Sequence, residues 1–167
     1  MGKPFIAVLM GSDSDLPKVT AGVEVLRTFD IPVEVRISSA HRTPKATHDY
    51  VVDADQRGCA VFICCAGMAA HLAGAVAALT VKPVIGVPLE AGALQGLDAL
   101  LSTVQMPAGI PVATVAIGKA GAKNAAYLAV QILALHDAGL AEQLRRDREK
   151  QAQTVLEKNN QNRRLGG

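Results

Sequence analysis

A histidine and an arginine stand next to each other in the segment 38–44, which reads Ser-Ser-Ala-His-Arg-Thr-Pro. The segment follows a β-branched run over 33–37, typical of a strand, and precedes a helical pattern that begins at Pro44, with Thr43 as its cap. Imidazole exchanges protons near neutral pH, and a guanidinium binds phosphate or carboxylate groups. His41 is therefore a candidate for proton transfer and Arg42 for anion binding; the alternative is that His41 only caps the helix.

A second polar turn, Gly-Ser-Asp-Ser-Asp at 11–15, follows a uniformly apolar run over 5–10. Ser14 or Asp15 can cap a helix that begins near Leu16, with Pro17 in its first turn. Hydroxyls and backbone N–H groups at a helix N-terminus favour an anion, and carboxylates accept hydrogen bonds from ribose hydroxyls. The turn indicates either a phosphate and ribose site or a set of helix caps.

Small residues and another histidine make up the turn at 66–71, Ala-Gly-Met-Ala-Ala-His. The turn ends an apolar run over 61–65, so it occupies the same kind of strand end as the other two. Small residues let the backbone come close to a ligand. His71 falls in the first turns of an apolar helix, where a structural histidine is the more common outcome.

The common motifs of cofactor and metal sites are absent from the sequence. GxGxxG, Walker A, GxSxG and CxxC patterns do not occur, and no set of His, Cys, Asp or Glu has the spacing of metal ligands. Cys59, Cys64 and Cys65 lie in or beside an apolar run, where cysteine usually serves as a small hydrophobic residue. The motifs therefore give little support to a metal site or to binding of a dinucleotide or a nucleoside triphosphate.

Composition and charge exclude further classes of partner. Aromatic residues are only 3% of the chain, which leaves no stacking platform for single-stranded nucleic acid. The net charge of +2 comes from the C-terminal segment 138–167, which has seven Lys or Arg against four Asp or Glu. This balance argues against nucleic acid as the main partner. No secretory signal and no membrane-spanning stretch are visible, so the sequence predicts a cytoplasmic protein.

Strand and helix patterns alternate along the chain. The strands are predicted at 5–10, 33–37, 61–65, 84–87 and 112–117. One helix is predicted to begin near Leu16, and another to follow the turn at 66–71 and end at 79. The other helices are predicted at 44–55, 97–102 and 122–136. This alternation predicts an α/β fold with a parallel sheet between helical layers, in the flavodoxin-like strand order 2-1-3-4-5. The carboxyl ends of parallel strands share one edge, so we expect the turns at 11–15, 38–44, 66–71, 88–92 and 118–121 to meet there.

We expect one α/β domain over residues 1–167. Its last helix, over about 140–158, is charged and has only a thin apolar stripe. The polar segment 159–167 is expected to fray.

Four motifs, taken in order, carry a resemblance to a known family. They are GSDSD at 11–15, SSAHRTP at 38–44, AGMAAHLAG at 66–74 and VQMPAGIPVATVAIGKAGAKNAA at 104–126. Together they resemble the N5-carboxyaminoimidazole ribonucleotide mutase family, the class I form of the phosphoribosylaminoimidazole carboxylase catalytic subunit. The resemblance spans nearly the whole chain.

The resemblance implies a three-layer α/β fold assembled as a homo-octamer, with the C-terminal helix reaching a neighbouring subunit. It implies interconversion of N5-carboxyaminoimidazole ribonucleotide and 4-carboxy-5-aminoimidazole ribonucleotide in de novo purine biosynthesis, without metal, ATP or organic cofactor. The mechanism that the resemblance implies is transient release of carbon dioxide and its recapture on the imidazole carbon, with a histidine that shuttles the protons. A separate ATP-dependent synthetase is an expected functional partner.

The resemblance also assigns roles to residues. His41 matches the proton-shuttling histidine of the family. The residues expected to bind substrate are Gly11, Ser12, Ser14, Asp15, Ser39, Ala40, Arg42, Gly67, Ala70 and His71.

The sequence departs from the usual family pattern at Met68, Ala73 and Glu90, where a small residue, a proline and a glutamine are common. Two alternatives remain open at this point. One is an enzyme that carboxylates aminoimidazole ribonucleotide directly with carbon dioxide. The other is a flavodoxin-like nucleotide-binding module without enzymatic activity, although a receiver module would need a phosphoacceptor aspartate after the third strand, where the chain has Cys-Cys-Ala-Gly.

Overall fold

A parallel five-stranded sheet forms the centre of the computed structural model, which describes residues 4–165. The strands are β1 (Phe5–Met10), β2 (Val33–Ile37), β3 (Cys59–Gly67), β4 (Val84–Leu89) and β5 (Ala113–Thr114). Their order is β2-β1-β3-β4-β5, and every neighbouring pair is parallel. The predicted flavodoxin-like topology is therefore confirmed.

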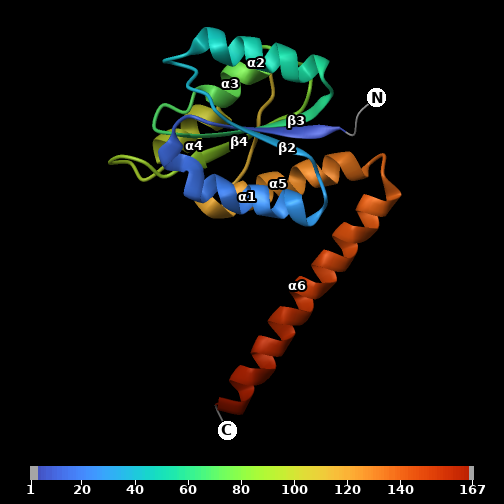
Figure 1. Cartoon of the computed structure of the whole chain (residues 1–167). Helices are drawn as coiled ribbons and strands as arrows, with labels where there is room; N and C mark the ends of the chain where they lie inside the picture. Colours follow the sequence, from blue (N-terminus) through green and yellow to red (C-terminus); the bar gives the residue numbers. More distant parts are fainter. Residues whose placement is uncertain (1–3, 166–167) are drawn as a thin grey trace. The chain divides into compact units, whose positions relative to one another are not determined.

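Helices cover both faces of this sheet (Figure 1). The helical elements of the chain are the 3-10 turn η1 (Asp13–Asp15), α1 (Leu16–Thr28), α2 (Pro44–Gln56), α3 (Leu72–Ala77), α4 (Leu97–Val104), α5 (Gly118–Ala134) and α6 (Ala138–Leu165). In Figure 1, α2 and α3 lie over one face of the sheet, and α1 and α5 lie over the other. All six residues of β1 and all six of β4 are buried, as expected for strands covered on both sides.

Two strands run past their predicted ends and one stops short. β3 extends to Gly67 and β4 to Leu89, with Ala66 opposite Pro88 in the register. β5 has only two residues instead of the expected six over 112–117. The N–H of Val115 still bonds the carbonyl of Gly86, at 3.1 Å. The next donor of β4 on that side would belong to Pro88, which has no N–H, so the ladder ends there.

The chain separates into two compact units, residues 1–130 and 131–167. The first contains the whole sheet, and the second contains the end of α5 and all of α6. The expected helix over 140–158 and frayed tail over 159–167 are corrected in part, because α6 runs from Ala138 to Leu165. No glycine or proline interrupts the helix between Gly139 and Gly166, which explains its length. Residues 166–167 lie outside the described range, and the single domain over 1–167 stays a prediction.

Candidate active site

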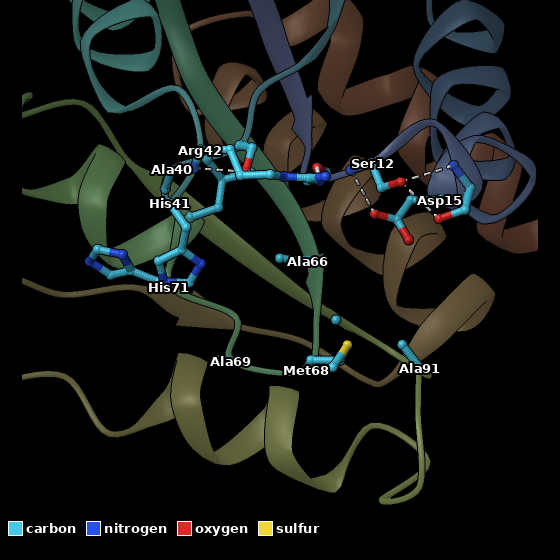
Figure 2. Close-up of a pocket in the computed structure, with 15 residues that line it drawn as sticks. Ser12, Asp15, Ala40, His41, Arg42, Ala66, Met68, Ala69, His71 and Ala91 are labelled. Atoms are coloured by element: carbon cyan, nitrogen blue, oxygen red, sulfur yellow. Dashed lines mark hydrogen bonds between the residues drawn. The ribbon is translucent and has the colours of Figure 1, made fainter.

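The carboxyl ends of β1, β2 and β3 open onto a cavity of about 460 Å³ (Figure 2). Of the residues predicted to act on substrate, those that line it are Gly11, Ser12, Ser14, Asp15, Ser39, Ala40, His41, Arg42, Gly67 and His71. Ala70 is not among the lining residues; its side chain is buried, with 3% exposed. The three turns singled out in the sequence thus meet at one site, as parallel strand ends require.

Ser12 caps the 3-10 turn η1, whereas the sequence had led us to expect Ser14 or Asp15 as the cap of the helix that begins near Leu16. The N–H of Ser12 donates to Oδ2 of Asp15 at 3.1 Å, and the Ser12 hydroxyl accepts the N–H of Ser14 at 3.4 Å. This reciprocal arrangement is a capping box on η1. Asp15 precedes α1 without a side-chain capping bond. Its carboxylate therefore stays in the cavity wall, available to a ligand.

Burial sets the electrostatics of Asp15. Desolvation raises the pKa of this carboxyl above its usual value, and the Ser12 N–H and the Lys18 ammonium oppose that rise. A half-buried carboxylate with one oxygen already held by a backbone donor is a well-positioned acceptor for a sugar hydroxyl.

Arg42 ties the second turn to the first. Its Nε donates to the hydroxyl of Ser39 at 3.3 Å, and its Nη2 reaches the carbonyl of Gly11 at 3.5 Å. These contacts hold the guanidinium at the cavity wall beside the serine turn. The expected cap at Thr43 is absent, because its hydroxyl donates to the carbonyl of Ser39 at 3.0 Å. Thr43 thereby closes the turn that carries His41 instead of capping α2.

His41 and His71 lie side by side at one end of the cavity (Figure 2). Their rings stack with centroids 5.1 Å apart and planes 26° apart. His41 comes from the turn after β2, and His71 directly precedes α3. Both side chains are exposed. The sequence predicted that His71 lies near the site, and the structure shows that its ring stacks on the ring of His41.

Small side chains shape the other end of the cavity, where Figure 2 shows Met68 and Ala91. A Cβ added at Gly67 would lie 2.9 Å from Cβ of Ala91, so only glycine allows this close approach. Met68 adopts a left-handed backbone with φ of 56° and leaves 57% of its surface exposed.

The substrate-binding residues expected from the resemblance do not make up the whole cavity wall. Ala66, Met68, Ala69, Leu72 and Ala91 also contribute to the wall. Four of these lie in or just after the small-residue turn at 66–71, and Ala91 lies in the fourth strand-end turn, so the strand-end rule was the available signal. The fifth predicted turn, at 118–121, does not line the cavity.

Within residues 4–165, no group of three or more His, Cys, Asp and Glu side chains could hold a metal ion. The cysteines are buried, and desolvation raises the pKa of Cys59 to about 11 and of Cys65 to about 12. These thiols stay protonated near neutral pH and act as core residues. In the same described range, no helix combines the length and the apolar character needed to cross a bilayer.

Comparison with known proteins gives consistent results. The family model described as AIR carboxylase matches residues 5–154. N5-carboxyaminoimidazole ribonucleotide mutase of Synechocystis is 53% identical over 98% of this chain and 92% of its own. The protein of the same name from Bacillus subtilis is 49% identical over 95% of this chain and 98% of its own. A crystal structure of PurE from Treponema denticola superimposes with a TM-score of 0.85 at 30% identity, covering 95% of this chain and 98% of that one.

Proposed function

The chain belongs to the AIR carboxylase family, and we propose that it works as the N5-carboxyaminoimidazole ribonucleotide mutase of purine biosynthesis. The reaction interconverts N5-carboxyaminoimidazole ribonucleotide and 4-carboxy-5-aminoimidazole ribonucleotide. The observation that carries the residue-level proposal is the cavity where His41, Arg42, Ser12 and Asp15 meet. It combines a proton carrier, an anion-binding group and hydroxyl and carboxylate acceptors, which a carboxylated ribonucleotide needs.

Substrate binding is assigned to the two polar turns. Arg42 faces the cavity beside the hydroxyls of Ser12 and Ser14, so the guanidinium and these hydroxyls bind the acidic parts of the substrate. Asp15 accepts a hydrogen bond from a ribose hydroxyl. The small side chains around Gly67 and Ala91 leave room for a flat imidazole ring.

His41 is the proposed catalytic acid and base. The bond between N5 and the carboxyl carbon breaks, and the amine takes up a proton while carbon dioxide is released inside the cavity. The imidazole C4 then attacks carbon dioxide, and the proton on C4 is removed. One proton is given and one is taken, so His41 returns to its starting state. A walled cavity keeps the carbon dioxide beside C4 during this exchange.

Other features of the family remain predictions for this chain. We propose a homo-octamer with α6 contacting a neighbouring subunit. A cytoplasmic location, catalysis without a cofactor and a functional link to an ATP-dependent synthetase are likewise proposed from the sequence.

The decisive experiment measures isomerisation of 4-carboxy-5-aminoimidazole ribonucleotide by the purified protein, with no ATP or metal added. Wild type should be active, and His41→Asn should lower kcat about 10²- to 10⁴-fold, the usual contribution of general acid–base catalysis. His48→Asn is a matched control, because His48 is an exposed histidine on α2 outside the cavity. Circular dichroism checks that each variant is folded.

The other outcomes decide between the alternatives. A wild-type protein that only decarboxylates the substrate to aminoimidazole ribonucleotide is a direct carboxylase. If the folded protein has neither activity, the mutase proposal is wrong and the binding-module alternative is tested next by measuring nucleotide binding. Equal loss in His41→Asn and His48→Asn would remove His41 from the mechanism.

A further inference from the structure

Lys18 and Glu90 form an ion pair between two elements far apart in the sequence. Nζ of Lys18 lies 2.9 Å from Oε2 of Glu90 and donates to the backbone carbonyl of the same residue at 2.7 Å. One ammonium thus holds both the side chain and the main chain of Glu90. Lys18 belongs to α1, and Glu90 directly follows β4.

Each partner is attached to a wall of the cavity. Lys18 stands three residues after Asp15, at the start of the helix that the serine turn opens. Glu90 precedes Ala91, which lines the cavity and packs where a Cβ on Gly67 would fall, at 2.9 Å. The pair therefore connects the substrate-binding turn after β1 to the wall formed by the loop after β4.

Further contacts hold Glu90 between the loop and α5. Its carboxylate lies directly against Gly118, the first residue of α5, which has a φ of 74°. A Cβ added at Gly96, where the loop ends, would fall 3.3 Å from Cα of Glu90. Both ends of the loop thus meet at this residue, so its position controls where Ala91 stands.

We propose that Lys18 and Glu90 are a positioning pair for the mutase reaction, fixing the Ala91 wall so that the cavity holds the imidazole ribonucleotide closely. The inference rests on the proposed function. Neither residue lines the cavity, so both act through neighbouring groups and not by touching the reacting atoms: the pair acts through the Ala91 wall, and Lys18 also favours the ionised carboxylate of Asp15.

The two partners should contribute unequally. Lys18→Met removes the ion pair and the bond to the Glu90 carbonyl, whereas Glu90→Gln keeps the shape of the side chain and the carbonyl bond. Partly exposed ion pairs contribute little, so we expect KM to rise about two- to five-fold in Lys18→Met and less in Glu90→Gln. kcat should stay close to wild type in both variants, because His41 is not displaced.

The test measures KM and kcat for 4-carboxy-5-aminoimidazole ribonucleotide at low and high ionic strength. Salt screens an ion pair, so KM of the wild type should rise with salt more steeply than KM of Lys18→Met. Exchanging the charges in the double variant Lys18→Glu, Glu90→Lys should give a lower KM than either single charge reversal. Asp49→Asn is the control, since it removes the exposed Lys45–Asp49 pair on α2.

Three results would overturn the positioning role: unchanged KM in Lys18→Met, the same salt dependence in wild type and Lys18→Met, or no rescue by the charge exchange. If the wild type does not isomerise the substrate, the proposed function fails separately. Whether Lys18 and Glu90 anchor the loop is then tested by hydrogen exchange of the backbone amides of residues 90–97 in the free protein. Faster exchange in Lys18→Met than in Asp49→Asn would keep it as the anchor of the loop, and equal exchange would reject it.

Discussion

The stacked pair of His41 and His71 shows how one side chain can orient another without sharing its chemistry. His41 stands on a turn closed by the hydroxyl of Thr43, and His71 stands at the start of α3. With ring centroids 5.1 Å apart, the ring of His71 occupies one side of the His41 ring and limits its rotation. A proton carrier held in one orientation needs less rearrangement when the substrate binds. We therefore propose that His71 positions His41, in addition to the substrate contact expected of it.

Asp15 allows a test of substrate binding at the level of one atom. Asp15→Asn removes a charged acceptor, and the loss of a charged hydrogen bond costs about 1.5–3 kcal/mol, so KM should rise roughly 10- to 100-fold. Steady-state kinetics with 4-carboxy-5-aminoimidazole ribonucleotide measures this change. Asp13→Asn is the matched control, because Asp13 belongs to the same turn but does not line the cavity. A similar rise in both variants would mean that the shape of the turn matters and the Asp15 carboxylate does not.

The pH dependence of KM provides a second test of the role of Asp15. Burial raises the pKa of Asp15, so its carboxylate becomes protonated at a higher pH than an exposed aspartate would. KM of the wild type should therefore rise as the pH falls through this raised value, and the rise should vanish in Asp15→Asn. A profile of log KM against pH, recorded for both proteins, provides the comparison.

Among the elements, α1 and α5 make an unusually close contact beneath the sheet. A Cβ added at Gly22 of α1 would lie 2.5 Å from the backbone carbonyl oxygen of Ala122 in α5. Gly22→Ala gains about 1 kcal/mol in helix propensity, but overpacking against a rigid backbone costs typically 1–3 kcal/mol. At this distance the cost of overpacking outweighs the gain in helix propensity, because no side-chain rotation can relieve a clash with a backbone carbonyl.

We therefore expect Gly22→Ala to lower the free energy of unfolding by about 1–2 kcal/mol, measured by urea denaturation. Glu24→Ala tests the propensity effect alone, since Glu24 is exposed on the same helix. If Gly22→Ala were as stable as wild type or more so, the two helices would have room that their backbone positions do not show.

Elements of the sheet could be predicted to different degrees, and the reasons are local. β1 and β2 have the predicted ends, because each apolar or β-branched run is followed at once by polar or small turn residues. β5 could not be predicted from its own sequence over 112–117. Its length depends on Pro88 of the neighbouring strand, which lacks the donor that would continue the ladder.

The residues of the cavity could also be predicted only in part. Strand-end turns placed His41, Arg42 and Asp15 together correctly, since parallel strands bring their carboxyl ends to one edge. Of the two neighbouring alanines only Ala69 lines the cavity, and this depends on the backbone after Gly67, where Met68 takes a positive φ. Sequence patterns do not encode that angle for a methionine, so Ala70 was expected at the wall and is buried instead.

At the scale of the molecule, α6 raises the question of what its outer half contacts. The helix has 28 residues, and every residue from Gln151 to Gln161 is exposed in the single chain. Val155 and Leu156 leave 66% and 56% of their surface exposed. Isolated helices are marginal in water, and most helices owe their stability to packing of an apolar face. A helix of this kind fits the proposed homo-octamer, in which a neighbouring subunit covers it.

The corresponding prediction concerns the state of assembly. Wild type should have a mass eight times that of one chain by size-exclusion chromatography with light scattering. The double variant Val155→Asp, Leu156→Asp should give smaller species, because two charges then replace the apolar contact. Gln153→Asp, Thr154→Asp adds the same charges to polar positions of the same helix and should keep the wild-type mass.

Since the sheet and its cavity lie in residues 1–130, circular dichroism of the smaller species should still show an α/β fold. An octamer in both double variants would show that α6 contributes no apolar contact to the assembly, and a monomeric wild type would exclude the octamer itself.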